Sequence, residues 1–244
     1  MTKTTDLKAV KDIAISFLCL PVGETPLSPL IVDHPIFETG VIGLKINGEI
    51  QNINIMTEDG FELAIKEYKK LINSCEKLIQ IYFFIRKSYR LTFLKFTKQF
   101  LSLKDFSNLL SEAWVTSENP NQDKNCNLAL ITKWFKATDK SILMNDEEYT
   151  VYIGLPDEFE VYRGVAVGRN PKGLSWTKSY DKALWFANRF NHDEKIGFVQ
   201  KGIAKKENVL AYFNRRNEDE IVVNIKDLKD VEIVTEKCKE EFLR

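Results

Sequence analysis

Apolar and polar residues change their spacing along this chain, and each change marks a different kind of element. In residues 12–56 short β-rich runs dominate, and Asn47-Gly48, the strongest short signal for a hairpin turn, separates two alternating runs. From Phe61 to Tyr82 apolar residues recur every three to four positions, which predicts one long amphipathic helix. The chain should therefore begin with a small sheet followed by a helix.

The middle of the chain is predicted to be helical. The long helix should start at a capping box formed by Asp59 and Glu62, and a second helix is expected over residues 103–114. The polar stretch 118–127 reads as a loop, and short helices follow it through Tyr152.

From Glu160 onward short β-rich segments alternate with turns, which predicts a series of strands. One helix, DKALWFANRF, interrupts these segments, and Ser179 is its candidate N-cap. The change of pattern indicates a boundary near residue 90 and two parts, residues 1–90 and 91–244. Strands and helices in separate runs favour the α+β class.

Composition excludes several kinds of protein. With 35 basic and 35 acidic residues the formal net charge is zero, so overall charge gives no preference for nucleic acid. The four cysteines are scattered without a CxxC pair and only two histidines are present, so neither a metal site nor a disulfide framework is expected. No apolar run reaches the roughly 18 residues that indicate a membrane span. We expect a cytoplasmic protein with no membrane partner.

Local charge is uneven in one stretch, Lys77–Lys104, which has seven basic residues, no acidic ones and interleaved aromatic rings. One interpretation is a set of amphipathic helices with the rings in the core and the cationic heads in water. The other is a surface for nucleic acid or an acidic partner, because phosphates attract cations and exposed bases stack on rings. The sequence leaves both open, and Arg86, Lys87 and Arg90 would carry the second.

Three short motifs in the strand-rich part carry candidate chemistry: Tyr162-Arg163-Gly164, Ser175-Trp176-Thr177 and Glu218-Asp219-Glu220. In an extended segment alternate side chains share a face, so Glu218 and Glu220 should point the same way and Asp219 the opposite way. Such a carboxylate pair can act at a glycosidic bond, one supporting a cationic sugar and the other orienting the nucleophile.

The other two motifs supply complementary groups. Arg163 has a planar, permanently charged fork that suits phosphate, and Ser175 and Thr177 offer hydroxyls on one face of their strand. Each motif alone could be an ordinary structural feature. Taken in this order, they imply a sugar that bears a pyrophosphate as the substrate.

Together these residues resemble the arginine-serine-glutamate class of ADP-ribosyltransferases, a class that includes phage and bacterial proteins. Arg163 in VYRGV corresponds to the class's first-strand arginine, Ser175 in LSWT to its serine motif, and the string EDE at 218–220 to its E-x-E motif. The helix DKALWFANRF also resembles a helical segment of the class. The likeness covers about residues 103–235.

The resemblance implies a split β-sandwich core with helices, in which residues 91–244 are the catalytic domain and residues 1–90 a small α/β module of unknown role. It also implies NAD as the co-substrate and no metal. Glu220 would stabilise the cationic ribose as nicotinamide leaves, and Glu218 would act on the nucleophile. The residues that would hold NAD are Arg163, Gly164, Ser175, Thr177 and Trp176, the last standing where a smaller residue is usual.

The acceptor is less closely defined by the resemblance. In this class an E-x-E pair accompanies an arginine acceptor, so a protein arginine is the simple expectation. The loop before the motif would read the target through Tyr212, Phe213, Arg215 and Arg216, and a ring beside two cations suits RNA or DNA equally well. The resemblance further suggests a toxin or effector in conflict between phage and bacterium, with an antitoxin or inhibitor protein as a partner. The alternatives are an inactive relative that binds nucleic acid or protein, and an NAD glycohydrolase.

Overall fold

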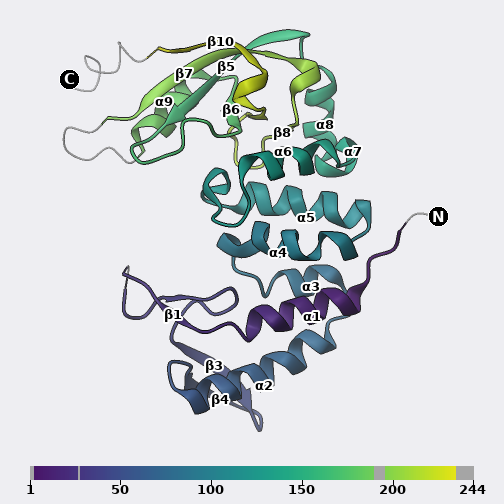
Figure 1. Cartoon of the computed structure of the whole chain (residues 1–244), viewed down its shortest axis with the longest axis vertical. Helices are drawn as coiled ribbons and strands as arrows, with labels where there is room; N and C mark the ends of the chain where they lie inside the picture. Colours follow the sequence, from purple (N-terminus) through teal and green to yellow (C-terminus); the bar gives the residue numbers. More distant parts are fainter. Residues whose placement is uncertain (1–2, 27, 190–195, 235–244) are drawn as a thin grey trace. The chain divides into compact units, whose positions relative to one another are not determined.

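The computed structural model describes residues 3–26, 28–189 and 196–234, and it has a mixed α+β architecture (Figure 1). The chain forms two compact units, Met1–Phe106 and Ser107–Arg244. The first unit is therefore longer than the module of residues 1–90 expected from the sequence. None of the helices among the described residues combines the length and the apolar character that crossing a membrane requires. His192 and Cys238 lie outside the described residues.

The first unit begins with a helix and not with a strand. Helix α1 spans Leu7–Leu18, and the Asp6 carboxylate caps it by accepting from the Ala9 N–H at 3.0 Å. The strand prediction for the start of residues 12–56 was wrong because the buried residues recur at helical spacing, and packing of that face outweighs the β-rich composition. The buried positions are Val10, Ala14, Phe17 and Leu18.

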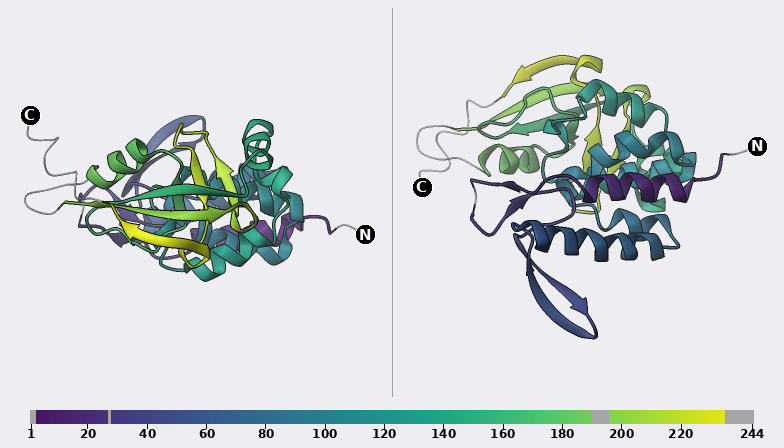
Figure 2. Two further views of the ribbon diagram at one scale, coloured as in Figure 1. Left: turned by 90° about the horizontal axis from the view of Figure 1, so that it is seen from above. Right: turned by 60° about the horizontal axis from the view of Figure 1, so that its bottom comes forward.

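The hairpin prediction is confirmed. Strands β3 (Val41–Ile46) and β4 (Glu49–Asn54) pair antiparallel, and Asn47 and Gly48 both have positive φ, 51° and 92°. The hairpin projects beyond the helices of its unit (Figure 2, right), and Ile50 at its tip is 80% exposed. A second short pair, β1 (Gly23–Glu24) and β2 (Val32–Asp33), completes the strands of this unit.

The long helix expected to continue to Tyr82 is divided. Helix α2 spans Glu58–Ser74 with Thr57 as its N-cap, in place of the expected capping box at Asp59 and Glu62. The chain turns extended at Cys75, and the Gln80 side chain then accepts from the N–H groups of the two residues before α3 (Leu78–Tyr82), which starts a new helix. The remaining helical segments of the unit are η1 (Lys87–Tyr89), α4 (Arg90–Thr97) and η2 (Lys98–Phe100).

The second unit opens with the helices that the sequence predicted. Its helical segments are α5 (Leu103–Thr116, which starts just before the unit boundary), η3 (Pro120–Gln122), α6 (Leu128–Lys136), α7 (Lys140–Leu143) and α8 (Asp146–Ile153). Large aromatic side chains pack between these helices, and the Trp114 ring on α5 and the Phe135 ring on α6 meet edge to face at 5.2 Å.

The sheet of the second unit has six antiparallel strands in the order β10-β7-β5-β6-β9-β8. The strands are β5 (Glu158–Val165), β6 (Ser175–Thr177), β7 (Phe198–Lys205), β8 (Ala211–Phe213), β9 (Glu220–Val222) and β10 (Leu228–Ile233), with η4 (Lys206–Asn208) and η5 (Ile225–Asp227) between them. Strands β5 and β6 share a single residue pair, Tyr162 with Thr177. The sheet therefore consists of two three-stranded halves that are joined at one point.

Helix α9 (Tyr180–Asn188) follows β6 and packs closely on β5 and β7. Ser179 caps it as predicted, accepting from the Lys182 N–H at 3.3 Å. A Cβ at Gly164 would collide with backbone atoms of Ala183 and Ala187, so this position on β5 requires glycine. The glycine beside Arg163 therefore sets how closely α9 approaches the strand.

Candidate functional site

A cleft in the second unit opens where the two halves of the sheet separate. Its lining residues come from β5, β6 and the first residue of β9, from α5 and the loop after it, from α9, and from the loops after β5 and before β9. The cleft is lined by Trp114, Glu118, Asn119, Pro120, Asn121, Tyr162, Arg163, Gly164, Ala166, Arg169, Ser175, Trp176, Thr177, Phe186, Arg189, Arg216, Glu218 and Glu220. The structure thus brings together all three of the motifs that the sequence singled out.

Glu220 is the most enclosed acid of this cleft. It begins β9, is 8% exposed, and its Oε1 accepts from the indole Nε1 of Trp114 at 3.0 Å. Burial raises the pKa of the Glu220 carboxyl, while hydrogen bonds from Ser175 and Trp114 oppose this shift by favouring the charged form. The result is a carboxylate held in one orientation by two donors with little water around it.

Ser175 is fixed from both sides. Its hydroxyl accepts from the Asn121 Nδ2 at 3.0 Å and hydrogen-bonds Glu220, while the Asn121 Oδ1 accepts from the Leu174 N–H at 2.6 Å. Asn121 therefore clamps the start of β6 and orients the serine toward the acid. This role was not visible in the sequence, because Asn121 lies in a stretch that reads as a simple polar loop.

Arg163 lies buried under the cleft. Its guanidinium donates to the backbone oxygens of Ser175 at 2.6 Å and Asn170 at 2.9 Å, and a Cβ at Gly173 would collide with it. Burial lowers the pKa of Arg163 to about 10, and the charge of Glu220 opposes the shift. Two hydrogen bonds thus brace the loop before β6, and the guanidinium still lines the cleft.

The Glu218-Asp219-Glu220 motif is not the extended segment expected from the sequence. Asp219 has a φ of 47°, and its carboxylate turns away from the cleft to bind Lys182 and the Tyr212 hydroxyl, the latter at 2.7 Å. Glu218 and Glu220 nevertheless both line the cleft, although the extended segment from which this was expected is absent at Asp219. The Glu218 carboxylate accepts from the Arg216 Nη2 at 2.9 Å, and its backbone oxygen accepts from the Thr177 hydroxyl at 3.0 Å.

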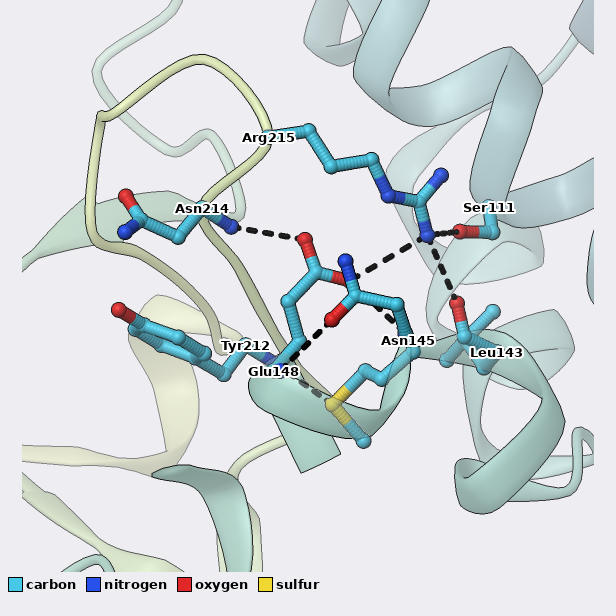
Figure 3. Close-up of polar contacts among 8 residues, drawn as sticks. Ser111, Leu143, Asn145, Glu148, Tyr212, Asn214 and Arg215 are labelled. Atoms are coloured by element: carbon cyan, nitrogen blue, oxygen red, sulfur yellow. Dashed lines mark hydrogen bonds and ion pairs between the residues drawn. The ribbon is translucent and has the colours of Figure 1, made fainter. Parts of the chain in front are cut away.

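The two arginines of the loop before β9 point to different surroundings. Arg215 donates to the Ser111 hydroxyl at 2.7 Å and pairs with Glu148 at 3.3 Å, and Glu148 is 2% exposed (Figure 3). The same Glu148 carboxylate accepts from the Asn214 N–H at 2.9 Å. Arg215 is therefore an anchor of the loop, whereas Arg216 faces the cleft.

Two of the four residues expected to read the target are in the core. Tyr212 and Phe213 are 3% and 2% exposed and form strand β8, so neither ring is available for stacking on a base. The resemblance placed them in the loop that reads the target, although their segment is β-rich. In the structure this segment pairs with β9 at the edge of the sheet, and both side chains are buried.

Several residues that line the cleft were not predicted from the sequence, and Trp176, which was expected to hold NAD, is almost fully buried. The lining residues outside the three motifs include Trp114, Arg169 and Arg189. Of these only Trp114 had a signal in the sequence, because the indole N–H of a buried tryptophan usually requires a hydrogen-bond partner. Trp176 lines the cleft but is 2% exposed, with its Nε1 donating to the Gly173 oxygen at 3.3 Å. Trp176 is therefore a buried residue of the cleft lining.

The charge of the cleft favours an anionic ligand. Its lining has four arginines and three glutamates, and two of the arginines, Arg216 and Arg189, make ion pairs with glutamates of the same cleft. Arg163 lies there too without a carboxylate within salt-bridge distance in the described residues. No group of three or more metal-binding side chains occurs in the described part of the chain.

The basic aromatic stretch Lys77–Lys104 is less suited to bind nucleic acid than the sequence suggested. The Arg86 Nη1 donates to the backbone oxygens of Val32, Phe37 and His34 at 2.7, 3.1 and 3.3 Å. Arg90 is buried over the Tyr82 ring at 4.6 Å and donates to a backbone oxygen of its own segment. Two of the three cations expected to contact nucleic acid are thus engaged within the unit.

Comparisons of the chain with protein-family models, with curated proteins and with solved structures found no match.

Proposed function

We propose that this chain is an NAD-dependent ADP-ribosyltransferase whose active site is the cleft between the two half-sheets. The observation that carries the proposal is the convergence of Arg163, Ser175 and Glu220, from three different strands, around one buried carboxylate. A structural scaffold has no need to bury an acid against a serine and a tryptophan N–H at the base of an open cleft. The near division of the sheet at Tyr162 and Thr177 also fits a split β-sandwich core.

In this proposal Glu220 acts on the ribose of NAD. Departure of nicotinamide leaves positive charge on the sugar, and a carboxylate in a site with little water stabilises that charge more strongly than it would in bulk solvent. Trp114 and Ser175 keep this carboxylate oriented and favour its ionised form. Their hydrogen bonds thus keep the acid fixed while the sugar charge develops.

The cationic side chains of the cleft would bind the pyrophosphate. Arg163 is buried without a carboxylate within salt-bridge distance among the described residues, so an anion beside it would restore charge balance. In addition it fixes the Ser175 backbone, which ties nucleotide binding to the placement of the serine. Arg163 therefore has both a binding and a positioning role here.

Glu218 would orient and deprotonate the acceptor. Its carboxylate already holds a guanidinium, that of Arg216, at hydrogen-bonding distance. A carboxylate that binds a guanidinium favours a protein arginine as the acceptor over RNA or DNA. The burial of Tyr212 and Phe213 and the engagement of Arg86 and Arg90 weaken the nucleic-acid alternative further. From the resemblance we further propose that the protein is a toxin or effector in conflict between phage and bacterium.

Labelled NAD tests the proposal directly. The purified chain is incubated with NAD that carries the label on adenine, with and without cell lysate, and both nicotinamide release and label on macromolecules are measured. We expect protease, and not nuclease, to remove the label from the product. Release of nicotinamide without transfer to any macromolecule would indicate an NAD glycohydrolase, and no release at all would favour an inactive binding protein.

A further inference from the structure

We propose that Arg216 is an internal acceptor, so that the chain attaches ADP-ribose to its own Arg216 side chain. The inference rests on the proposed function, because it takes NAD in the cleft as the donor. It names a modification site within the active site itself.

The placement of Arg216 is that of an acceptor arginine. Its side chain lines the cleft, and its Nη2 lies 2.9 Å from the Glu218 Oε2. The Glu220 side chain lines the same cleft. In the proposed mechanism Glu220 stabilises the ribose cation and Glu218 receives the proton of the nucleophile, so a guanidinium bound to Glu218 in this cleft is placed to attack the reacting carbon.

The backbone of the loop keeps Arg216 in this place. The neighbouring Arg215 is anchored to Ser111 and Glu148, and the Asn214 N–H donates to the same glutamate (Figure 3). The Asn214 side chain in turn accepts from the Asp219 N–H at 3.0 Å, which closes the loop around Arg216. These contacts hold the loop on both sides of Arg216, and the Arg216 side chain is 42% exposed.

The chemical step is balanced with NAD as the only co-reactant. A guanidinium nitrogen of Arg216 forms a bond to C1 of the nicotinamide-bearing ribose, and the bond from that carbon to the nicotinamide nitrogen breaks. The electron pair of the broken bond leaves with nicotinamide, which becomes neutral. The proton lost from the guanidinium passes to the Glu218 carboxylate and then to water.

Other arginines of the unit are placed less well for this step. Arg163 is buried and donates to two backbone oxygens, and Arg215 pairs with the buried Glu148. Arg189 pairs with Glu118 at 3.7 Å and lies over the Trp185 ring at 5.4 Å. Among these cations Arg216 alone contacts the acid that the mechanism assigns to the nucleophile.

The test uses the purified full chain with NAD and no other acceptor. After digestion, peptides are searched by mass spectrometry for an ADP-ribosyl group, and nicotinamide release is measured in parallel. We expect the adduct on Arg216 in the natural chain and none at that position in Arg216→Lys, which keeps the charge but lacks the guanidinium. Lys226→Ala, which removes an exposed charge outside the cleft, serves as the matched control and should be modified like the natural chain.

A second measurement separates an acceptor from a merely structural arginine. In Arg216→Ala the position beside Glu218 is open, so transfer to added free arginine, normalised to nicotinamide release, should rise about two- to fivefold, the range expected on removal of a competing exposed ion pair. Nicotinamide release with no adduct on Arg216, or adducts spread evenly over exposed arginines, would overturn this inference and leave the proposed function standing. Absence of nicotinamide release would overturn the proposed function itself.

Discussion

Arginines are used differently in the two compact units. In residues 1–106 Arg86 is bound to three backbone oxygens and Arg90 is buried over a tyrosine ring. In the second unit, cationic side chains line an open cleft beside carboxylates, and Arg216 contacts one of them at 2.9 Å. The stretch with the highest density of basic residues therefore lies in the unit where Arg86 and Arg90 are bound within the protein, whereas the arginines that line the cleft come from separate parts of the sequence.

The same contrast is repeated within two consecutive residues. Arg215 and Arg216 read as one basic pair in the sequence, yet Arg215 is bound by a buried glutamate and a serine, and Arg216 faces the cleft. A cation whose donors are held by a buried acid, as those of Arg215 are, is less available to a ligand than a cation that lines an open cleft. Four variants can break or sharpen this distinction between structural and functional charges.

The largest effect is expected for Glu220→Gln. An amide has the shape of the carboxylate but cannot stabilise a sugar cation, so nicotinamide release and transfer should both fall by about 100-fold or more. Binding of NAD, measured by calorimetry, should change little. Near-normal turnover by a folded Glu220→Gln variant would contradict the role of this cleft.

Glu218→Ala should separate the two halves of the reaction. Transfer to a protein acceptor should fall by about 100-fold, because the nucleophile loses its base, while water can still capture the cation formed with help from Glu220. The measurement is the ratio of transferred label to nicotinamide released, with Asp219→Asn as the control outside the cleft. Equal loss of release and transfer in Glu218→Ala would remove the division of labour between the glutamates.

Arg86→Ala tests the structural side of the comparison. The substitution leaves backbone oxygens near Val32 and Phe37 without their donor, and we expect the free energy of unfolding to fall by about 2 kcal/mol. The neighbouring Lys87→Ala, at an exposed position, should change it by less than about 0.5 kcal/mol. Chemical denaturation measures both. A salt-dependent loss of transfer in Lys87→Ala would revive a nucleic-acid surface in this stretch.

Trp114→Phe should have the smallest effect and a distinctive pH dependence. Burial raises the pKa of Glu220 and the Trp114 hydrogen bond lowers it, so removal of the donor should raise that pKa further. Because the ionised form is the active one, activity declines as pH falls through this pKa, and the decline should begin at a higher pH in the variant. At neutral pH we expect about a tenfold loss, the typical value of a hydrogen bond to a charged group. An unchanged pH profile would show that Trp114 does not act on Glu220.

The sequence by itself determined most local structure of the second unit. Turn residues and alternating runs predicted the strands around Arg163, Ser175 and Glu220, and Ser179 predicted the start of α9. The hairpin at Asn47-Gly48 was equally visible, because positive φ at both residues is a local requirement. The three polar motifs also each contributed residues to the lining of one cleft.

Only the tertiary structure decided what those side chains do. Composition suggested a strand where α1 lies, and the resemblance suggested a target-reading loop where β8 lies; both were wrong because burial depends on partners far along the chain. The contacts of Glu220 with Trp114 and of Arg215 with Glu148 join residues 106 and 67 positions apart, and no local pattern encodes such pairs. Whether a polar side chain is an anchor or a reactive group depends on the hydrogen bonds that the folded chain gives it. Those bonds join distant residues, so only the tertiary structure determines them.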